Sequence, residues 1–525
     1  MPRVPDIPVW RKFAPSPRPA ADVEQLPTLI AGGGLVGLTI ALDLARKGHP
    51  VTVLNRLDFV PAGSKAICYA KRTLEILDRL GIGDAMVAKG VVWDTGKVFW
   101  RDSEDPIYQY DLLPVKNQKM SAFINLQQYH AETILAEALS AMPNAEIRWG
   151  HALAGVEQKG NTVLVDVETA DGPYRIETGW LIACDGSHST VRELMGLEFE
   201  GRVFEDNFLI ADIRMEGDRP SERWFWFDPP FNRGQSALFH KQPDNVWRLD
   251  FQLGWDIDRE DCVRDGKVEP YIRAMLGEGV PFEKEWYSIY TFQCRRMARF
   301  VHDRVIFAGD AAHLVSPFGA RGFNGGVADA DNLVWKLDLI LRGEADRDLL
   351  ESYNEEATTI ADENILNSTR STDFMTPKSL ASRALRDAVL ELARDHPFAR
   401  PFVNSGRLST AVSYPASPLN TPDEDPDWAG VAPGSPAIDG PLGDGWLLNR
   451  LGNDFVLLAH GVGPQAIPGL AAIDIGTAEL LCERYDLKPG SACLVRPDQY
   501  IAARWRSPTV AKIVSAIAWA KGGAI

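Results

Sequence analysis

Three glycines near the start of the chain have the spacing G-x-G-x-x-G, which can hold a pyrophosphate: Gly32, Gly34 and Gly37. The first permits a tight turn, the second lets the backbone approach the pyrophosphate, and the third lets a helix pack closely on a sheet. Leu35 and Val36 would begin that helix, whose free N–H groups and positive dipole end suit phosphate oxygens. The glycines therefore predict a dinucleotide-binding turn.

The residues around this turn predict a βαβ unit that positions it. Apolar runs predict strands over 28–31 and 51–54, and the segment between them predicts a helix that ends near Lys47. The second strand of such a unit commonly ends in an acid that binds a ribose, but here Asn55 and Arg56 follow it. We expect the Asn55 amide to take the place of the acid, or else only to end the strand.

A second group of candidates stands in LIACDGSHSTVREL, residues 181–194. An apolar strand runs into Asp185, and a helix is expected to begin near Ser189. An acid at the carboxyl end of a central strand lies where open α/β sheets bind ligands. Arg192 could meet a phosphate or pair with Asp185. The alternative is a strand–turn–helix corner with capping Asp and Ser side chains.

A third group lies in residues 304–337. A buried strand is predicted over 305–308, Asp310 follows it, and a glycine-rich loop then precedes a helix. Such a loop directs N–H groups and a helix dipole at a ligand, here a ring or carbonyl group that gains negative charge. His313 is expected to be a loop histidine satisfied by backbone. The candidate loop residues are Pro317, Gly319, Gly322, Phe323 and Asn324.

The composition limits the class of protein. A net charge of −17 argues against a nucleic-acid partner, because phosphate binding needs a basic surface. The six cysteines form no C-x-x-C and do not cluster with histidines, which argues against a metal site and for a reducing compartment. The N-terminus lacks the apolar core of a secretory signal, and no segment is suited to cross a membrane. We therefore expect a cytoplasmic protein with no membrane partner.

The apolar pattern changes along the chain. Aromatic-rich, strand-like runs in 199–295 predict an antiparallel sheet, a natural wall for an apolar substrate pocket. Near the C-terminus, two strands are predicted to form a hairpin around RPDQ. The predicted parts are an N-terminal arm (1–26), a nucleotide-binding domain (27–198 and 296–400), the antiparallel-sheet domain (199–295), a linker rich in Pro, Ser, Asp and Gly (401–444) and a small α/β unit (445–525).

Three motifs now stand in order along the chain: GGGLVG, CDGSHSTVR and FAGDAAHLVSPFGARGFNGG. Together they resemble the class A flavoprotein monooxygenases, single-component aromatic hydroxylases that use FAD and NAD(P)H. The resemblance spans about residues 25–410 and implies an α/β fold, with a Rossmann-like FAD-binding domain and an inserted antiparallel substrate sheet. The C-terminal part resembles the thioredoxin-like domain of the phenol hydroxylase and 3-(3-hydroxyphenyl)propionate hydroxylase branch. Because it lacks C-x-x-C, we expect it to pack or assemble rather than catalyse.

The resemblance also implies roles for single residues. The glycine turn would hold the FAD pyrophosphate, and Asp185 would lie beside it and support NAD(P)H binding, with Arg192 near. Asp310 would bind the ribityl chain, and the glycine-rich loop would face the isoalloxazine. The other positions assigned to FAD are Asn55 in place of the usual ribose glutamate, the neighbouring Arg56, Lys65 where many members have arginine, Gln128 near the flavin and Leu153 beside the adenine.

The implied reaction is hydroxylation of a phenolic or related aromatic ring through a flavin C4a-hydroperoxide, with consumption of O2 and NAD(P)H. A His or Tyr in the aromatic sheet could remove the phenol proton, and His240 and Tyr287 are the candidates. Arg233 and Arg248 could meet a substrate carboxylate, although a solvated arginine is the expectation for each. Whether the protein forms a homodimer is left open.

Other functions stay open at this point. The run WFWFDP, residues 224–229, echoes the W-x-W-x-I-P of flavin-dependent halogenases, with Asp228 in place of isoleucine. A non-redox flavoprotein or FAD-binding regulator would share the cofactor site. The same monooxygenase chemistry could act on a non-aromatic ring, such as that of an antibiotic or polyketide.

Overall fold

The computed structural model describes residues 8–63, 65–113, 115–217, 219–264, 266–403, 408–425, 427–461 and 467–523. Residues 1–7 of the predicted arm thus lie outside the described residues. A central sheet has the strand order β10-β3-β2-β13-β12-β11, and β20 also pairs with β13. The pairs β10–β3, β3–β2, β2–β13 and β13–β20 are parallel, so these strands end at one edge. The bounds are β2 Val23–Ala31, β3 Val51–Asn55, β10 Ala145–Trp149, β11 Ala152–Lys159, β12 Thr162–Glu168, β13 Tyr174–Ala183 and β20 Val305–Phe307.

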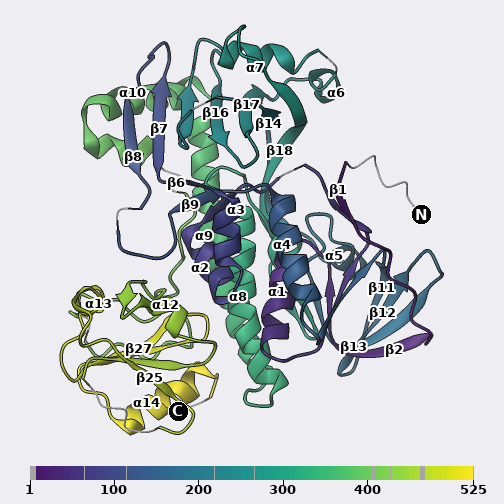
Figure 1. Cartoon of the computed structure of the whole chain (residues 1–525), viewed down its shortest axis with the longest axis vertical. Coiled ribbons are helices and arrows are strands. Elements are labelled where there is room, and N and C mark those ends of the chain that lie inside the picture. Colours follow the sequence, from purple (N-terminus) through teal and green to yellow (C-terminus); the bar gives the residue numbers. More distant parts are fainter. Residues whose placement is uncertain are drawn as a thin grey trace.

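Helices pack beside this sheet and carry its core. In Figure 1, α1 (Leu35–Arg46), α4 (Gln128–Ser140) and α8 (Gly322–Leu341) run through the middle of the molecule, and α9 (Leu349–Met375) packs along α8. Nearly every residue of α1 is buried. This fits a helix that is apolar on most sides and enclosed by a sheet and other helices.

A second, largely antiparallel sheet has the strand order β21-β18-β14-β17-β16-β15-β7-β8. Because side chains alternate along a strand, the sheet has two different faces. Aromatic and aliphatic side chains of its outer face pack with α6 (Arg259–Cys262) and α7 (Glu269–Leu276). The sheet extends beyond the predicted segment 199–295, because β7, β8 and β21 join it from either side. The bounds are β7 Thr95–Trp100, β8 Tyr108–Asp111, β14 Glu200–Arg214, β15 Arg223–Phe227, β16 Ser236–Lys241, β17 Val246–Gly254, β18 Glu283–Arg296 and β21 His313–Leu314.

The C-terminal unit contains a four-stranded sheet of its own, in the order β25-β24-β26-β27. β26 (Ala492–Val495) and β27 (Ile501–Trp505) form the hairpin predicted around RPDQ. Figure 1 shows this unit in yellow, beside the helices and far from the second sheet. Its other elements are β24 Val456–Ala459, β25 Ala471–Asp474, α13 Glu479–Tyr485 and α14 Val510–Ala520.

Buried charges join this hairpin to α8 and α9. Glu356 of α9 accepts hydrogen bonds from Arg496 at 2.7 and 3.1 Å and from Lys336 of α8 at 2.7 Å. Arg496 also donates to Asp498, with its Nε 2.9 Å from the carboxylate. Burial opposes ionisation of Glu356, but Arg496 and Lys336 outweigh it and hold its pKa well below the usual range. We call Lys336, Glu356, Arg496 and Asp498 the interdomain cluster.

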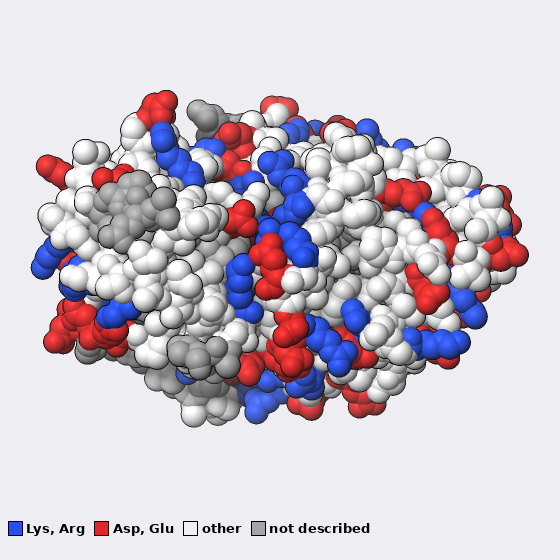
Figure 2. Space-filling view, turned by 90° about the horizontal axis from the view of Figure 1, so that it is seen from below, with Lys and Arg blue, Asp and Glu red and all other residues white. Residues whose placement is uncertain are grey.

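The surface shown in Figure 2 mixes charges of both signs. Blue and red side chains are interspersed across this face, and its described part carries no broad basic patch. No helix among the described residues is both long enough and apolar enough to span a membrane. The remaining elements are β1 Val9–Lys12, β4 Phe59–Pro61, β5 Cys68–Ala70, α2 Lys71–Arg79, α3 Gly83–Lys89, β6 Val91–Trp93, β9 Phe123–Asn125, α5 Thr190–Leu194, β19 Val301–His302, the 3-10 turns Gly309–Ala311 and Pro397–Ala399, α10 Leu380–Asp395, α11 Arg400–Val403, β22 Pro441–Leu442, β23 Gly445–Trp446 and α12 Leu447–Arg450.

Candidate active site

The three sequence motifs follow neighbouring parallel strands. Ala183 at the end of β13 is paired with Ala31 of β2 on one side and with Phe307 of β20 on the other. The loops that carry Gly34, Asp185 and Asp310 therefore start side by side at one edge of the sheet. This is the edge at which open α/β sheets bind ligands.

Close contacts between the motifs explain the glycines. Gly32 has φ +109°, and a Cβ there would lie 2.4 Å from the carbonyl oxygen of Cys184. A Cβ at Gly37 would lie 2.0 Å from the oxygen of Gly32. A Cβ at Gly309 would lie 2.9 Å from Val36, so Val36 packs on the third motif. Larger residues at these positions would push the three motifs apart.

The first turn leaves space where a phosphate group would lie. Gly34 is the N-cap of α1, no side chain caps the helix, and the nearest outside atom to a Cβ at Gly34 would be Glu132 Oε1, at 4.0 Å. Asn55 lies beside the turn, because a Cβ at Gly33 would be 3.0 Å from its side chain. Arg56, in contrast, is exposed. The turn fits a pyrophosphate with a ribose near Asn55.

The second motif is tied to the third by Arg192. Its guanidinium donates to the backbone carbonyl oxygens of Ala311 at 3.0 Å and Ser187 at 2.8 Å. Asp185 Oδ2 accepts from the Val191 N–H at 3.1 Å, whereas its buried Oδ1 has no partner among the described residues. Burial raises the pKa of Asp185. Such an orphaned oxygen fits a carboxyl group that receives a ligand.

Helix α4 brings polar side chains to the glycine turn. Gln128 accepts from the Ala66 N–H at 3.2 Å and donates to Glu132 at 2.8 Å. Burial raises the pKa of Glu132 to about 7, and the nearby charge of Lys65 opposes this shift. Leu153 of β11 is half-buried and packs against the core of the central sheet. The sequence alone assigned no role to Glu132.

Asp310 faces an internal space. Its side chain is accessible to a water-sized probe, yet surrounding protein desolvates it and raises its pKa, while His313 and Lys65 oppose that shift. Burial and the charge of Asp310 raise the pKa of Tyr290 on β18 to about 12. Asp310 of the cofactor edge and Tyr290 of the second sheet are therefore close enough for their charges to interact. His313 pairs with Asp329 at 2.7 Å through a side chain, where sequence reasoning expected a backbone partner.

The glycine-rich loop is held from several sides. The Asn324 carbonyl oxygen accepts from the Ala70 N–H at 3.0 Å and from Thr73 at 2.6 Å, and its amide donates to the Cys68 carbonyl at 2.9 Å. The ring centroids of Phe323 and Tyr69 lie 5.0 Å apart. Gly319 has φ +97°, and its carbonyl accepts from the Ser409 N–H at 2.7 Å. Pro317 precedes this turn, and α8 begins at Gly322. The loop is thus fixed in place for a ligand at the helix N-terminus.

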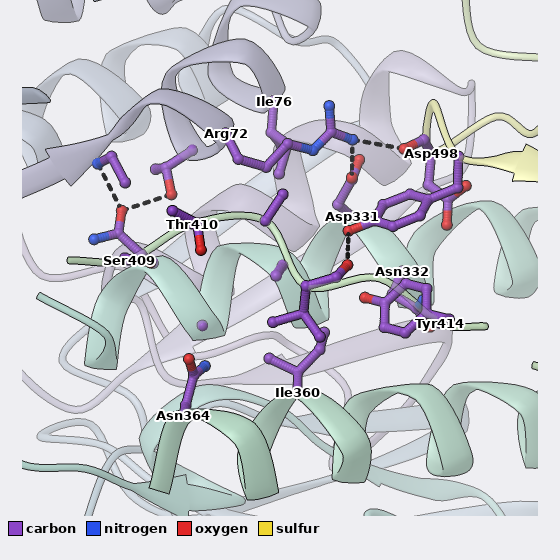
Figure 3. Close-up of a pocket in the computed structure, with 18 residues that line it drawn as sticks. Arg72, Ile76, Asp331, Asn332, Ile360, Asn364, Ser409, Thr410, Tyr414 and Asp498 are labelled. Carbon is purple, nitrogen blue, oxygen red and sulfur yellow. Dashed lines mark hydrogen bonds and ion pairs between the residues drawn. The ribbon is translucent and has the colours of Figure 1, made fainter. Parts of the chain in front are cut away.

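Behind the loop, a small cavity of about 20 Å³ separates it from the C-terminal unit (Figure 3). Arg72 crosses this region and donates to Asp331 at 2.9 Å, to the Asp498 carbonyl at 2.6 Å and to Gln499 at 3.0 Å. The volume suits a single water molecule. The RPDQ turn therefore supports α2 and α8, and α8 begins where the glycine-rich loop ends.

A much larger cavity, of about 580 Å³, lies between the loop and the second sheet. Its walls are mainly apolar and aromatic, with Phe318 and Gly319 of the loop on one side and β15 on the other. Other lining residues include Val98, Tyr110, Phe123, Arg223, Phe225, Phe227, Met375 and Ile438. This size and lining are those of a site for a drug-sized apolar ligand.

The face of the sheet on this side carries five buried or half-buried ionisable residues, which we call the inner-face cluster: Arg223, His240, Arg248, Asp212 and Asp250. Arg223, His240, Arg248 and Asp212 are cross-strand neighbours in one row. Arg248 binds Asp212 with two contacts of 2.8 Å. Arg223 Nη1, His240 Nδ1 and Asp250 Oδ1 are buried without a hydrogen-bond partner among the described residues. This cluster is less completely paired than the interdomain cluster.

The structure separates the two residues expected to act as a base. His240 faces inward but is 2% exposed, and burial with the charges of Arg223 and Arg248 lowers its pKa well below the usual range. Tyr287 lies on the opposite face, against the cluster that contains α7, because its strand neighbours Trp286 and Ser288 take the inner positions. The structure therefore does not bring Tyr287 to the site. Arg233 is exposed and binds Asp102.

Sequence reasoning missed Arg223 and Asp250. Alternation along β15 and β17 places them on the inner face, but which face is inner depends on the register of the whole sheet. No group of His, Cys, Asp and Glu side chains among the described residues is arranged to hold a metal ion.

The fold and this site define a flavoprotein. The family described as FAD binding domain matches residues 25–368, and the chain belongs to it. It is a flavin-dependent monooxygenase of the class A aromatic hydroxylase type, which confirms the expected family, cofactor and enzyme class.

Relatives share most of the length. The chain is 30% identical over 541 residues to a 6-methylpretetramide 4-monooxygenase of Streptomyces rimosus, covering 93% of this chain and 91% of that protein. It is 28% identical over 397 residues to a 3-(3-hydroxy-phenyl)propionate/3-hydroxycinnamic acid hydroxylase of Escherichia coli, covering 73% and 69%. The crystal structure of the flavin-dependent monooxygenase PieE matches with a TM-score of 0.82 at 22% identity, covering 97% of this chain and all of that one.

Proposed function

We propose that this protein is an NAD(P)H-consuming monooxygenase that hydroxylates a phenolic or related aromatic ring. The observation that carries the proposal is the cavity of about 580 Å³ between Phe318–Gly319 of the cofactor loop and the aromatic face of β15. A ring in this cavity would lie against the loop that the family uses for the flavin. Mainly apolar walls exclude water, which favours oxygen transfer to a ring over side reactions.

The residues present fit FAD. Space beside Gly34, the orphaned Oδ1 of Asp185 and the accessible carboxyl of Asp310 lie along one edge. When bound, FAD supplies the redox chemistry: it takes a hydride from NAD(P)H and delivers one atom of O2 to the ring, and the other atom leaves as water. The N-terminus of α8, just after Gly322, would stabilise negative charge on the isoalloxazine.

Other residues would serve the cofactor less directly. Asn55 would bind the adenosine ribose through its amide. Gln128 of α4 and Lys65, which precedes β5, would contact the flavin or its phosphates, and Leu153 would line the adenine end. Arg192 would hold the second motif in place, because it donates to backbone carbonyls at 2.8 and 3.0 Å. Exposed Arg56 would act only at the rim.

A larger, multi-ring substrate is the second candidate. The cavity volume of about 580 Å³ exceeds what one phenol ring needs, and the relative from Streptomyces rimosus is named for 6-methylpretetramide. We propose testing both substrate sizes. The C-terminal unit would be thioredoxin-like by its strand order and would support the active-site loop through the RPDQ turn rather than carry redox chemistry. Its cysteines, Cys482 and Cys493, are free.

The cofactor part of the proposal is tested with Asp310→Ala. Loss of the carboxyl group at the ribityl position should yield a soluble but colourless protein. FAD content per chain, measured by absorbance after purification, checks this. Asp346→Ala, which removes an exposed carboxyl group beyond the end of α8, should remain yellow. A yellow Asp310→Ala protein with full FAD content would contradict the assignment.

The reaction is tested by measuring NAD(P)H consumption with a panel of simple phenols and anhydrotetracycline-type polyketides, with product mass as the second readout. We expect substrate-stimulated consumption and a product heavier by one oxygen atom. A chloride requirement with chlorinated product would favour a halogenase. No stimulation by any compound, in a protein that holds FAD, would favour a non-redox flavoprotein.

A further inference from the structure

Asp250 stands on the inner face of the second sheet, the face that also carries Arg248 and Asp212. It lies opposite Leu238 of β16, which in turn lies opposite Phe225, a wall of the large cavity. On its other side, Asp250 pairs with Ile210, which is opposite Ser288. Tyr290 lies two residues after Ser288, on the same face of β18, and the charge of Asp310 contributes to its raised pKa. Asp250 thus lies on the sheet face that carries Arg223, two strands from the cavity wall at Phe225.

The carboxyl group of Asp250 is accessible although protein surrounds it. Its side chain is 17% exposed, while its neighbour His240 is 3% exposed. The buried Oδ1 has no hydrogen-bond partner among the described residues, and Oδ2 lies 3.8 Å from His240 Nε2, beyond hydrogen-bond range. A carboxyl group that is largely desolvated, partly exposed and free to accept hydrogen bonds is suited to receive a proton from a ligand.

Asp212 on the neighbouring strand shows the contrast. Both of its oxygens accept from Arg248 at 2.8 Å, and Oδ1 also accepts from Gln242 at 3.0 Å. Asp212 is therefore fully used within the protein. Arg248 also reaches toward the Lys65 carbonyl, at 3.5 Å, which places this strand beside Lys65 of the cofactor domain.

Charges on every neighbouring element face Asp250. Burial raises its pKa to about 6, Asp212 adds to the shift, and Arg248 and Arg223 oppose it. A base with a pKa in this range is ionised at neutral pH and can still be protonated during turnover. The titratable groups around it are Arg248 on its own strand, Asp212 on β14, Arg223 on β15, His240 on β16 and Cys68 on β5.

We propose that Asp250 is the proton acceptor for the substrate hydroxyl group, an inference that rests on the hydroxylase function proposed above. The hydroxyl O–H bond breaks, its proton goes to a carboxylate oxygen of Asp250, and the electron pair stays on the substrate oxygen. Arg223, which lines the cavity, stabilises the resulting oxyanion. The electron-rich ring then attacks the oxygen atom delivered by the cofactor, and the ring carbon later loses its own proton.

His240 takes a different role in this arrangement. It is buried among Arg223 and Arg248, which disfavour an added positive charge, so it stays neutral and cannot be the group that titrates. Its Nε2 lies 3.8 Å from Asp250, so His240 stands beside the carboxyl group without a hydrogen bond to it.

The test compares FAD-loaded wild type with Asp250→Asn, using as substrate the compound that the wild type oxygenates fastest in the screen above. In the wild type, kcat/KM should fall as pH drops through about 6, because Asp250 becomes protonated. Asp250→Asn should lower kcat by about 10²- to 10⁴-fold and lose this acid limb. Without NAD(P)H, ultraviolet difference spectra should show the bound substrate as an oxyanion in the wild type and as a neutral phenol in the variant.

Three further variants make the result specific. Asp256→Asn, the same change at an exposed site six residues along the chain, should match the wild type. His240→Gln should keep the acid limb even where its rate falls, and Asp250→Glu should retain both limb and oxyanion band at reduced rate. An Asp250→Asn protein with full FAD content and kcat within about threefold of wild type, or with the oxyanion band intact, overturns the proposal. Failure of the wild type to oxygenate any compound instead overturns the hydroxylase function.

Discussion

The interdomain cluster and the inner-face cluster are both buried groups of charges, but they are paired to different degrees. In the interdomain cluster, each carboxylate contacts a cation, and Glu356 also accepts from Asn332 at 2.6 Å and Ser417 at 2.6 Å. In the inner-face cluster, Asp250, Arg223 and His240 keep buried atoms without hydrogen-bond partners among the described residues. The first arrangement is complete within the protein, whereas the second leaves capacity for a ligand.

The pKa shifts follow the same division. The cations around Glu356 overcome burial and hold its pKa well below the usual range, while burial wins at Asp250 and raises its pKa to about 6. Burial without full pairing costs free energy. A protein keeps such a group where chemistry needs it, so incomplete pairing locates the site better than residue type does.

Matched arginine substitutions in the two clusters are expected to give the largest effect and test the comparison directly. Arg496→Met should lower the free energy of unfolding by about 3–5 kcal/mol, because it leaves Glu356 and Asp498 buried with an incomplete set of cations. Arg223→Met, in the less completely paired cluster, should change it by less than about 1 kcal/mol. Urea unfolding followed by tryptophan fluorescence measures both values. Equal losses would show that the two clusters do not differ in kind.

A smaller effect is expected from the pH dependence of stability. Because Asp250 has a folded pKa of about 6, above the unfolded value of about 3.9, its protonation stabilises the fold fully at low pH. That contribution is lost as pH rises from about 4 through 6. The free energy of unfolding of Asp250→Asn, relative to that of wild type, should therefore rise by about 2 kcal/mol between pH 4 and pH 8. A pH-independent difference, measured by urea unfolding at both values, would contradict the raised pKa.

Glu356 should show the opposite dependence, which sharpens the contrast. Its folded pKa lies below the unfolded one, so its stabilisation is present above the unfolded pKa and is lost as pH falls. The difference in free energy of unfolding between wild type and Glu356→Gln should therefore shrink as pH falls. The neighbouring exposed Glu355 offers the control, since Glu355→Gln should unfold like wild type at every pH.

The smallest effect is expected at Tyr287. Its side chain lies on the outer face, so Tyr287→Phe should change stability by less than about 0.5 kcal/mol. It should also leave the pH profile of kcat/KM unchanged. Loss of the acid limb in this variant would mean that the face assignment of β18 is wrong.

The cofactor edge could be predicted from sequence because local geometry dictates it. Gly32, Gly37 and Gly309 stand where a Cβ would meet backbone or a packed side chain at 2.9 Å or less, so the residue type itself carries the information. The substrate face could not be predicted in this way. Tyr287 and Trp286 differ by one position, and only the pairing of β18 with β14 decides which one turns inward.

The same limit applies to domain boundaries. β7 and β8 precede the second sheet by about a hundred residues in sequence, yet β7 pairs in parallel with β15. Residues 95–111 by themselves do not indicate that β15 is the partner, because a strand's partners depend on long-range pairing rather than on its own propensity. The position of Arg223 at the site therefore follows from the pairing of the whole sheet and not from its own sequence neighbourhood.

The RPDQ turn also has a consequence for biosynthesis. Arg72 and Glu356 emerge from the ribosome long before Arg496 and Gln499, which complete their surroundings. Until translation reaches the final hairpin, Glu356 has Lys336 but lacks Arg496. Likewise, Arg72 has Asp331 but lacks its partners in the RPDQ turn. A premature stop codon before position 496 would therefore remove contacts of residues encoded far upstream.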